Sequence, residues 1–509
     1  MNEGDENGLR VEQLALLRSD RLVETVAGSF MDDDTDREIF GDSEDILDDG
    51  STAHGQDRRS KLRLCLMASF AFGFSFYVYL STVGVLPSQV LVLVGSKDKG
   101  KFLAAVVGAA GVITFLVSPL VGTLSDRLQT RFGKRSPIIL ICSIILCILM
   151  FGLAWAAPTL PGCQTDSCYS VNTSKPICSH DNDSVCSTAD TENITLYGVY
   201  FIVYAAVAGL YAAIGTAWNG LIADVCPDDT RGFVSGMVGL FVLFGNAAGA
   251  LWNVFYRTIG VWATYASVSV TFFVTVLICL FGAKEESSIG RVNRQPLNFK
   301  AGIKQYWKPL KNWDFFWVFM TRFLMQMGLY TIIGYLYYFM VDVVNLPKCM
   351  SPERATGLIM LPLLMAGGVV GIIAGNWSDR LQRRKPFVAS AGIVMAIGCA
   401  GFFTWVRDFY PGIVLATFIG IGYGLYVTVD YALLLDVLPD KMSKGNDIAV
   451  WHQSLVLPQF LAVPIAGVVV DHLQKVGCKH ALGYVVLFVI TGFYFLLSGV
   501  FILFVRKVR

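Results

Sequence analysis

Twelve long apolar runs constrain the fold of this 509-residue chain more than any other feature. A hydrocarbon core about 30 Å thick needs about 20 apolar residues of helix to cross it. Runs of this length lie at residues 64–94, 102–124, 137–157, 195–223, 233–256, 260–282, 314–341, 355–377, 386–406, 411–437, 448–470 and 482–505. Because a bilayer offers no partner to an open sheet edge, we expect helices. The sequence predicts an all-α polytopic membrane protein with twelve transmembrane helices.

The scarcity of charge agrees with this prediction and argues against a soluble enzyme. Only 16% of the residues are charged, whereas an average soluble domain has about 25%. The sequence contains no nucleophile elbow, Walker loop or His-Glu-x-x-His pattern, so we expect no enzymatic activity, no metal and no organic cofactor. Basic blocks with interleaved aromatic residues do not occur outside the apolar runs, so we expect no nucleic-acid partner.

The first 57 residues differ in charge from the rest of the chain. They hold seventeen acidic residues and four arginines, whereas the remainder has an excess of Lys and Arg. A segment so acidic and so poor in aromatic residues cannot bury enough apolar area to fold. We therefore predict a disordered acidic cytoplasmic tail over residues 1–60. Within it, Glu12–Leu17 has the pattern of an acidic dileucine signal for a sorting adaptor, or else a transient helix.

The distribution of Lys and Arg between the runs predicts the orientation. With the N-terminus in the cytoplasm, the inner segments hold 25 basic residues, the outer segments hold ten, and one lies within a run. Cytoplasmic loops carry the excess of positive charge in membrane proteins. We therefore expect both chain ends in the cytoplasm.

The connection 158–194 supports the same orientation. It carries glycosylation sequons at Asn172, Asn182 and Asn193 and cysteines at Cys163, Cys168, Cys178 and Cys186. Both features are typical of a lumenal or extracellular segment. Four cysteines allow three disulfide pairings, and a further bridge between Cys349 and Cys478 would also lie outside. A plasma membrane and a lysosomal or vacuolar membrane fit equally.

An internal repeat divides the chain. Gly122-Thr-Leu-Ser-Asp126-Arg127 follows the second run, and Gly375-Asn-Trp-Ser-Asp379-Arg380 follows the eighth. The first copy continues with the basic residues Arg131, Lys134 and Arg135 and with Gly133 between them, and the second continues with Arg383, Arg384 and Lys385. We predict two six-helix bundles in parallel repeat, residues 61–282 and 314–509, joined by a basic cytoplasmic linker over 283–313.

These two motifs resemble the signature loop of the major facilitator superfamily. The longer form Arg131-Phe-Gly-Lys-Arg-Ser-Pro137 is similar to the branch of the sucrose–proton symporters and related glycoside–cation symporters. Agreement extends to the aromatic run from Ala71, to Trp218–Asp224, and to Gly422–Asp436. The resemblance covers about residues 60–509 and implies a transporter that works by alternating access. It also implies a cytoplasmic gate, whose candidate residues are Gly122, Asp126, Arg127, Arg131, Gly133, Lys134, Arg135, Asp224, Gly375, Asp379 and Arg380. At Gly122 and Gly375 the missing side chain would permit close helix packing.

The sequence departs from the sugar branch in its fourth run. The charged residues of that helix are missing here, because Asp224 stands at its cytoplasmic end. Three ionisable residues lie elsewhere inside the runs: Arg322, Asp430 and His452. Each is costly in a membrane and indicates a function. At 1.5 Å per residue they lie at similar depths, so we expect an Arg322–Asp430 pair. Asp430 would carry the coupling proton and His452 would tune it, or the pair would only fix helix packing.

Polar uncharged residues supply candidates for substrate contact. They are Tyr77, Ser81, Asn219, Asn246, Gln326, Tyr330, Tyr423 and Tyr426. Amides, carboxylates and aromatic rings suit a sugar, although the same groups also serve as contacts between membrane helices.

The sequence as a whole predicts a proton-coupled secondary transporter of a small polar solute, with a sugar as the expected class. One alternative is an organic anion or other small metabolite in the same fold, with Arg322 as its counter-ion. Another is a non-transporting sensor or scaffold. We expect a monomer whose partners are the substrate and the lipid bilayer.

Overall fold

The computed structural model describes residues 61–95, 98–157, 194–226, 230–285, 287–289, 307–347, 350–381, 383–405, 408–437, 444–475 and 482–507. This part of the chain belongs to one compact unit, Ser60–Arg509. The predicted tail, most of the linker and nearly all of the 158–194 connection lie outside the described residues. So do the three sequons and the cysteines of the predicted disulfides, which are Asn172, Asn182, Asn193, Cys163, Cys168, Cys178, Cys186, Cys349 and Cys478.

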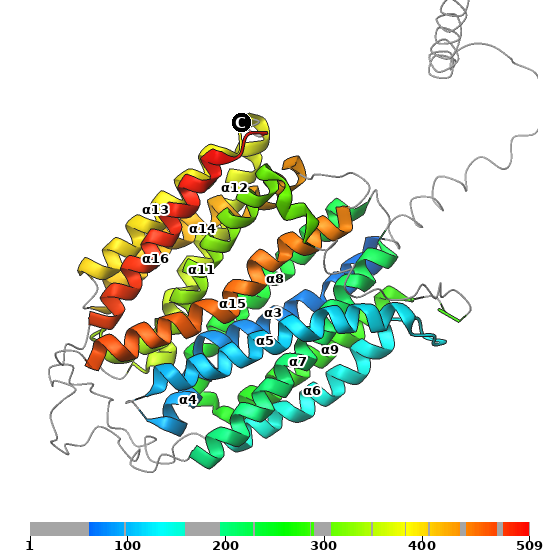
Figure 1. The fold of residues 1–509 in the computed structure, drawn as a ribbon. Coiled ribbons are helices and arrows are strands. Elements are labelled where there is room, and N and C mark those ends of the chain that lie inside the picture. Colours follow the sequence, from blue (N-terminus) through cyan, green and yellow to red (C-terminus); the bar gives the residue numbers. More distant parts are fainter. Residues whose placement is uncertain are drawn as a thin grey trace, which may run out of the picture. The chain divides into compact units, whose positions relative to one another are not determined.

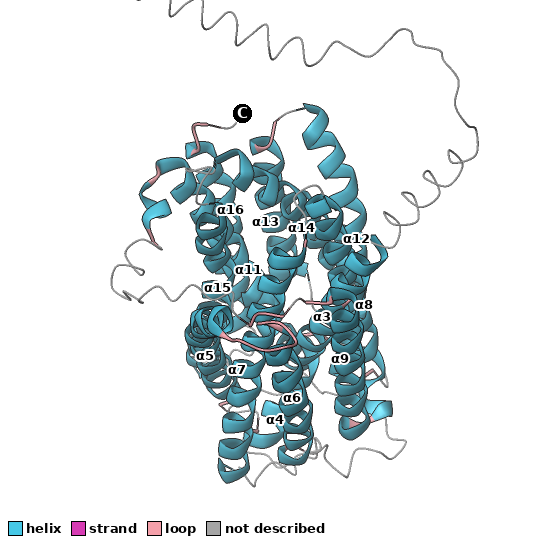
Figure 2. Ribbon diagram, turned by 90° about the vertical axis from the view of Figure 1, so that its right-hand side faces the viewer, coloured by secondary structure: helices cyan, strands magenta, loops and turns pink. Residues whose placement is uncertain are grey.

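The described chain is helical almost throughout (Figure 2). Its helices in chain order are α3 (Phe70–Leu80), the π-helix η1 (Ser81–Val85), α4 (Leu86–Val94), α5 (Lys99–Arg127), α6 (Ser136–Ala156), α7 (Ile194–Val225), α8 (Arg231–Ile259), α9 (Val261–Ala283), η3 (Lys308–Lys311), α11 (Trp313–Asp342), α12 (Pro352–Leu381), α13 (Lys385–Trp405), α14 (Phe409–Val437), α15 (Lys444–Lys475), α16 (Leu482–Phe501) and η4 (Ile502–Phe504). Within these residues the only β pairing is an isolated bridge between Asn345 and Asp408.

Twelve helical segments of the described chain are long and apolar enough to cross a membrane, which confirms the predicted fold class. The predicted helix ends were less accurate. α5 has 29 residues and α12 has 30, so each is about 44 Å long at 1.5 Å per residue and extends beyond the hydrocarbon core. As a result Asp126, Arg127, Asp379 and Arg380 lie in the last turns of these helices rather than in the loops after them.

The first span, Lys61–Val94, contains a π-helical turn in its middle. The turn covers Ser81–Val85 and ends just before Pro87, which stands in the first turn of α4. Proline cannot donate a hydrogen bond, and its ring collides with the carbonyl four residues earlier. A wider turn before the proline relieves this collision, so the helix continues across the membrane with a local change of pitch.

The helices form two sets with the same internal packing. In the first half, α3–α9, the first span packs on α8 and α9, α6 on α7 and α9, and α5 on α7. In the second half, α11–α16, α11 packs on α15 and α16, α13 on α14 and α16, and α12 on α14. These are the same pairs by helix order. The halves meet where α5 packs on α15 and α8 packs on α12, and Figure 1 shows α5 and α15 side by side.

Successive spans alternate in direction, so the connections fall into two groups. We call one side the Gly133 end, after the α5–α6 connection, and the other the Gly260 end, after the α8–α9 connection. Lys61, where the described chain begins, and the C-terminal residues after α16 both lie at the Gly133 end. The names carry no assumption about which end faces the cytoplasm.

Candidate functional site

A buried ion pair joins two helices of the second half. The Arg322 guanidinium on α11 donates to the Asp430 carboxylate on α14. Their side chains are 11% and 4% exposed. Because each charge would be very costly alone at this position, the two residues depend on each other. The structure thus brings together the two residues that the sequence singled out by their charge.

Trp451 completes the surroundings of Arg322. The guanidinium carbon lies 3.5 Å from the centre of the Trp451 ring, on α15, which is a cation–π contact. Trp451 itself is buried. Three helices therefore fix one cation, Arg322, between a carboxylate and an aromatic face. The sequence analysis missed Trp451, although it directly precedes His452.

One polar group of the pair, the Nε of Arg322, makes no hydrogen bond to the described residues. The hydroxyl of Tyr426, which precedes Asp430 by one helical turn on α14, lies beside the Asp430 carboxylate. Buried donors in proteins are usually hydrogen-bonded. The pair therefore has unused hydrogen-bonding capacity where a substrate hydroxyl or carboxylate could bind.

His452 follows Trp451 but differs from it in exposure. Its side chain is exposed, and it lies near enough to Arg322 to interact with it electrostatically. An imidazole at this place senses the charge of the pair. His452 is thus a neighbour of the Arg322–Asp430 pair.

Tyrosines lie near the pair on α11, and others cluster on α3 and α7 of the first half. Tyr330, two turns after Arg322 on α11, accepts a hydrogen bond from Gln459 Nε2 at 2.7 Å and interacts electrostatically with Arg322. In the first half, Tyr211 of α7 stacks on Phe74 at 3.9 Å and contacts Tyr77 at 5.4 Å between ring centres. Each half therefore carries aromatic rings with hydroxyl groups on its buried helices.

The other predicted substrate residues lie in different surroundings. Tyr423 is half-buried and interacts electrostatically with both Arg322 and Asp430. Ser81 is buried in the π-helical turn, and Gln326 is buried on α11. Asn219 is exposed and Asn246 is half-buried. No contact given for the described residues connects Ser81, Asn219, Asn246 or Gln326 with the ion pair.

A second charged site lies at the Gly133 end of the first half. Arg135, just before α6, donates from Nε to Asp224 Oδ2 at 2.6 Å and from its NH1 nitrogen to Ser125 Oγ at 3.3 Å. Lys134 Nζ also lies 3.1 Å from Asp224. The signature residues Lys134, Arg135 and Asp224 therefore tie α5, α6 and α7 together within one half.

The second half repeats this arrangement. Arg384, just before α13, donates from Nε to Asp436 Oδ2 at 2.8 Å and from its NH1 nitrogen to Ser378 Oγ at 3.3 Å. We call Ser125–Arg135–Asp224 and Ser378–Arg384–Asp436 the two Ser–Arg–Asp triads. The sequence analysis identified the loop repeat, which includes Ser125, Ser378 and Arg384, but it did not predict the triad contacts or the part of Asp436 in them. The matching Ser-Asp-Arg letters before each basic run were the available signal.

Glu285 adds an anion to the first triad's surroundings. Its carboxylate accepts hydrogen bonds from the backbone N–H groups of Lys134, Arg135 and Ser136 at 2.9–3.2 Å, and from Ser136 Oγ. These groups form the N-terminus of α6, where a negative charge is favourable. Gly133 has φ +91°, and a Cβ there would lie 2.2 Å from the Glu285 carboxyl carbon. Glycine is therefore required at position 133.

The remaining gate residues are less defined. Arg131 and Arg380 are exposed, while the side chains of Asp126, Arg127 and Asp379 lie outside the described residues. The expected close packing at Gly122 and Gly375 is wrong. A Cβ at either position would have its nearest neighbour at 3.8 Å, on Thr216 and Thr428 respectively, which is ordinary contact distance.

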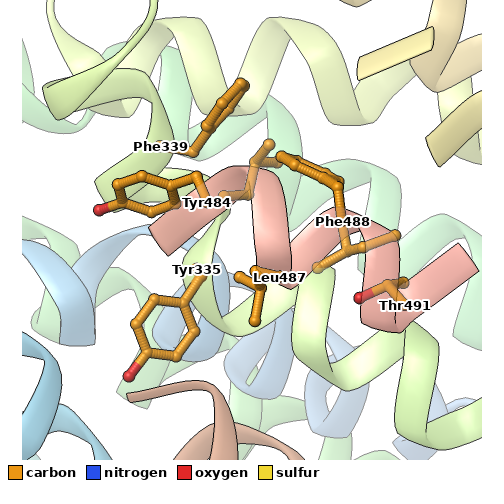
Figure 3. A pocket seen from close by; sticks show the side chains of 8 residues that line it. Tyr335, Phe339, Tyr484, Leu487, Phe488 and Thr491 are labelled. Atoms are coloured by element: carbon orange, nitrogen blue, oxygen red, sulfur yellow. The ribbon is translucent and has the colours of Figure 1, made fainter. Parts of the chain in front are cut away.

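A small pocket lies away from these groups. It is lined by residues of α11 and α16, all apolar or aromatic except Thr491. Figure 3 shows the hydroxyls of Tyr335 and Tyr484 directed away from Leu487 and Phe488. The pocket offers no charged group, so we do not assign the substrate site to it.

Known proteins share this fold. The family model described as Major Facilitator Superfamily matches residues 193–445 and 355–509. No curated protein sequence matches the chain. A solved D-xylose-proton symporter is 17% identical, covers 88% of this chain and 98% of its own, and gives a TM-score of 0.61. The nucleoside transporter NupG is 13% identical over 88% and 99%, with a TM-score of 0.57. A bacterial homolog of the human lysosomal transporter Spinster, solved inward-facing and unoccupied, is 13% identical over 87% and 94%, with a TM-score of 0.55.

Proposed function

Because this chain belongs to the Major Facilitator Superfamily, we propose that it is a proton-coupled secondary transporter that carries a small polar solute, a sugar, by alternating access. The observation that carries the proposal is the Arg322–Asp430 pair, an ion pair buried inside membrane spans. Ionisable residues at such depth are expensive and mark ion or proton pathways. The D-xylose-proton symporter among the similar structures agrees with the sugar class.

In the proposed cycle Asp430 gives up its partner and takes a proton. Arg322 remains charged throughout, because guanidinium does not deprotonate in proteins. When substrate hydroxyls bind Arg322, the carboxylate of Asp430 loses its ion pair and becomes costly in the buried site. Protonation removes that cost, so substrate and proton bind together. Tyr426 and Tyr330 provide hydroxyls beside the pair for the solute, and His452 provides an exposed group for proton exchange.

The orientation and location also belong to this proposal. The basic segments place the Gly133 end and both chain ends in the cytoplasm. The Gly260 end then faces outward, on a plasma membrane or a lysosomal or vacuolar membrane. Residues 61–282 and 314–509 act as the two bundles, and the two Ser–Arg–Asp triads stabilise their cytoplasmic sides. We place the chain in the sucrose–proton symporter branch on its Arg131–Pro137 motif.

Uptake into proteoliposomes tests the function. Purified protein with labelled sucrose, glucose or xylose should accumulate one of these sugars several-fold when the outside is acidic, and should not concentrate it without the gradient. Asp430→Asn should abolish accumulation, while the sugar should still equilibrate across the membrane down its own concentration gradient. Asp98→Asn, which changes an acid in a pair with Lys101 on the same helix end, should behave like the parent. Accumulation that is equal with and without the gradient would exclude proton coupling.

An organic anion is the second candidate, favoured by the unpartnered Nε of Arg322. Guanidinium binds carboxylates through two parallel hydrogen bonds, and Nε is one of the usual donors. Competition against the uptake of a labelled sugar separates the two candidates. If an unlabelled neutral sugar inhibits this uptake more strongly than a monocarboxylate does, the result favours the sugar.

A further inference from the structure

Three groups of polar contacts join the two halves at the Gly260 end. The first group centres on Lys99, at the start of α5. Lys99 is 3% exposed, and its ammonium pairs with the Asp342 carboxylate at the end of α11. Tyr484 of α16 donates to the same carboxylate, and the ammonium lies 5.0 Å from the ring centre of Tyr338. A lysine is seldom buried so deeply unless it is paired.

The second group lies beside the first, between α5 and α15. Asp471 accepts a hydrogen bond from the backbone N–H of Lys101 at 2.7 Å. This places a carboxylate at the N-terminus of α5, where the free N–H groups favour an anion. Tyr335 of α11 donates to the carbonyl of Gly100 at 3.1 Å. A Cβ at Gly100 would lie 2.3 Å from Asp471 Oδ1, so only glycine admits the carboxylate.

The third group lies on the other side of the boundary, where α4 and α8 meet α12. Glu353, in the first turn of α12, is 2% exposed. It accepts hydrogen bonds from Ser88 of α4 at 2.9 Å and from Tyr337 of α11 at 3.1 Å. Arg257 Nε, near the end of α8, lies 3.1 Å from Glu353 Oε2. A buried carboxylate of the second half is thus bound by two helices of the first.

In each of the three groups, a carboxylate from one half meets donors from the other half. The carboxylates of Asp342, Asp471 and Glu353 all come from the second half. Their partners across the boundary, Lys99, the Lys101 amide, Ser88 and Arg257, all come from the first half. By contrast, the triads at the Gly133 end each lie within one half. The groups also lie at both places where the halves pack together, α5 against α15 and α8 against α12.

We propose that these three groups form a latch that holds the Gly260 end closed, and that transport requires all three to open together. The proposal rests on the alternating access proposed above. Since the groups pin both sides of the boundary, neither side can open while the other stays in place. Opening must move one half as a body, and it must separate three carboxylates from their partners and return the buried Lys99 ammonium to water. The latch contacts therefore set how often the Gly260 end opens.

Accessibility of a buried reporter tests the latch. Ala104 of α5 is buried, and its Cβ lies 3.0 Å from the Cβ position at Gly467 of α15. We would introduce Ala104→Cys and measure its labelling by a maleimide in the purified full chain, over the labelling of the parent. Lys99→Gln and Glu353→Gln should each raise the labelling rate at least fivefold. Ser88→Ala, which removes one hydrogen bond, should raise it less. Lys99→Asp with Asp342→Lys should return the rate toward the parent value.

Lys101→Gln is the matched control. The Lys101 side chain pairs with Asp98 on the same helix end and does not cross the boundary, so labelling should stay at the parent rate. Unchanged labelling in Lys99→Gln, Glu353→Gln and Ser88→Ala would overturn the latch, and so would an equal rise in Lys101→Gln. Because the labelling assay needs no substrate, its result can be interpreted even if the protein carries no sugar or is not coupled to protons. Normal sugar uptake with unchanged labelling would remove the latch alone.

Discussion

Arg322 is held by two different interactions, an ion pair with Asp430 and the face of Trp451. Burying the ions costs several kcal/mol each, which their attraction must offset. A cation–π contact contributes about 0.5–2 kcal/mol. The Nε of Arg322 nevertheless makes no hydrogen bond to the described residues. The ion pair is stable without a ligand. A ligand that accepts a hydrogen bond from the Nε of Arg322 can nevertheless compete with Asp430 for the guanidinium.

The first prediction concerns the coupling between these two charges. Asp430→Asn leaves the Arg322 charge unpaired, and Arg322→Gln leaves the Asp430 carboxylate unpaired. Each single variant should lose about 3–5 kcal/mol of unfolding free energy. The double variant should lose clearly less than the sum, because it leaves neither charge alone. Unfolding of the purified variants in detergent measures this, and strictly additive losses would contradict the pair.

Residues of the site differed in how well the sequence revealed them. Arg322 and Asp430 could be predicted because a charge in an apolar run has few explanations. Trp451 could not, because an aromatic residue in an apolar run is ordinary for a membrane helix. Lys99, Asp342 and Glu353 stand at run ends, where charge is expected on topology alone. Only their contacts across the halves distinguish them.

At the scale of the element, the two Ser–Arg–Asp triads show why the loops repeat. In each half an arginine before the third helix reaches back to a serine on the second and across to an aspartate on the fourth. Three helix ends are thus fixed by one side chain. Arginine suits this place because its guanidinium presents several donors in one rigid plane.

The second prediction concerns the helix surface beneath the first triad. A Cβ at Gly220 of α7 would lie 1.9 Å from the NH1 nitrogen of Arg135. Gly220→Ala should therefore displace Arg135 and destabilise the protein by about 1–3 kcal/mol, as overpacking does. Gly122→Ala is the control, since its Cβ would meet Thr216 at 3.8 Å. Thermal unfolding of both variants measures the difference, and equal stability would show that Arg135 adapts freely.

Sequence patterns predicted the number and type of the elements better than their ends. Twelve spans follow from hydropathy because the membrane imposes one length and one polarity on each. The ends of α5 and α12 were placed too early because polar residues near the membrane surface can continue a helix. The π-helical turn at Ser81–Val85 follows from Pro87, but a proline in an apolar run is equally compatible with a simple kink.

On the scale of the whole molecule, the two halves follow one packing plan. The same helix pairs pack in both halves, and each half closes its Gly133 end with its own triad. Within the described residues the largest contacts between the halves are α5 with α15 and α8 with α12, and smaller ones join the first span with α11 and α12. Each half therefore contains most of the interactions that define its own structure.

The third prediction follows from this division. Residues 1–289 and 307–509, expressed as two chains in one cell, should assemble and co-purify through a tag on either chain. The contacts between the halves described above lie on the helices themselves, so we expect them to form without a covalent link. Co-purification should fall when Lys99→Gln is introduced, whereas Lys101→Gln should leave it unchanged. Halves that never co-purify would show that the connection itself is required for assembly.

The triads being internal to each half has a consequence for biosynthesis. Ser125, Arg135 and Asp224 have all left the ribosome before α11 is made, so the first half can finish its own contacts early. Domains generally fold as units during synthesis, starting from the N-terminus. Lys99 and Arg257, in contrast, must wait in the membrane for carboxylates that are translated later. The buried Lys99 ammonium in particular would stand in the half-finished chain without its carboxylate, which makes that chain a natural substrate for membrane chaperones and for quality control.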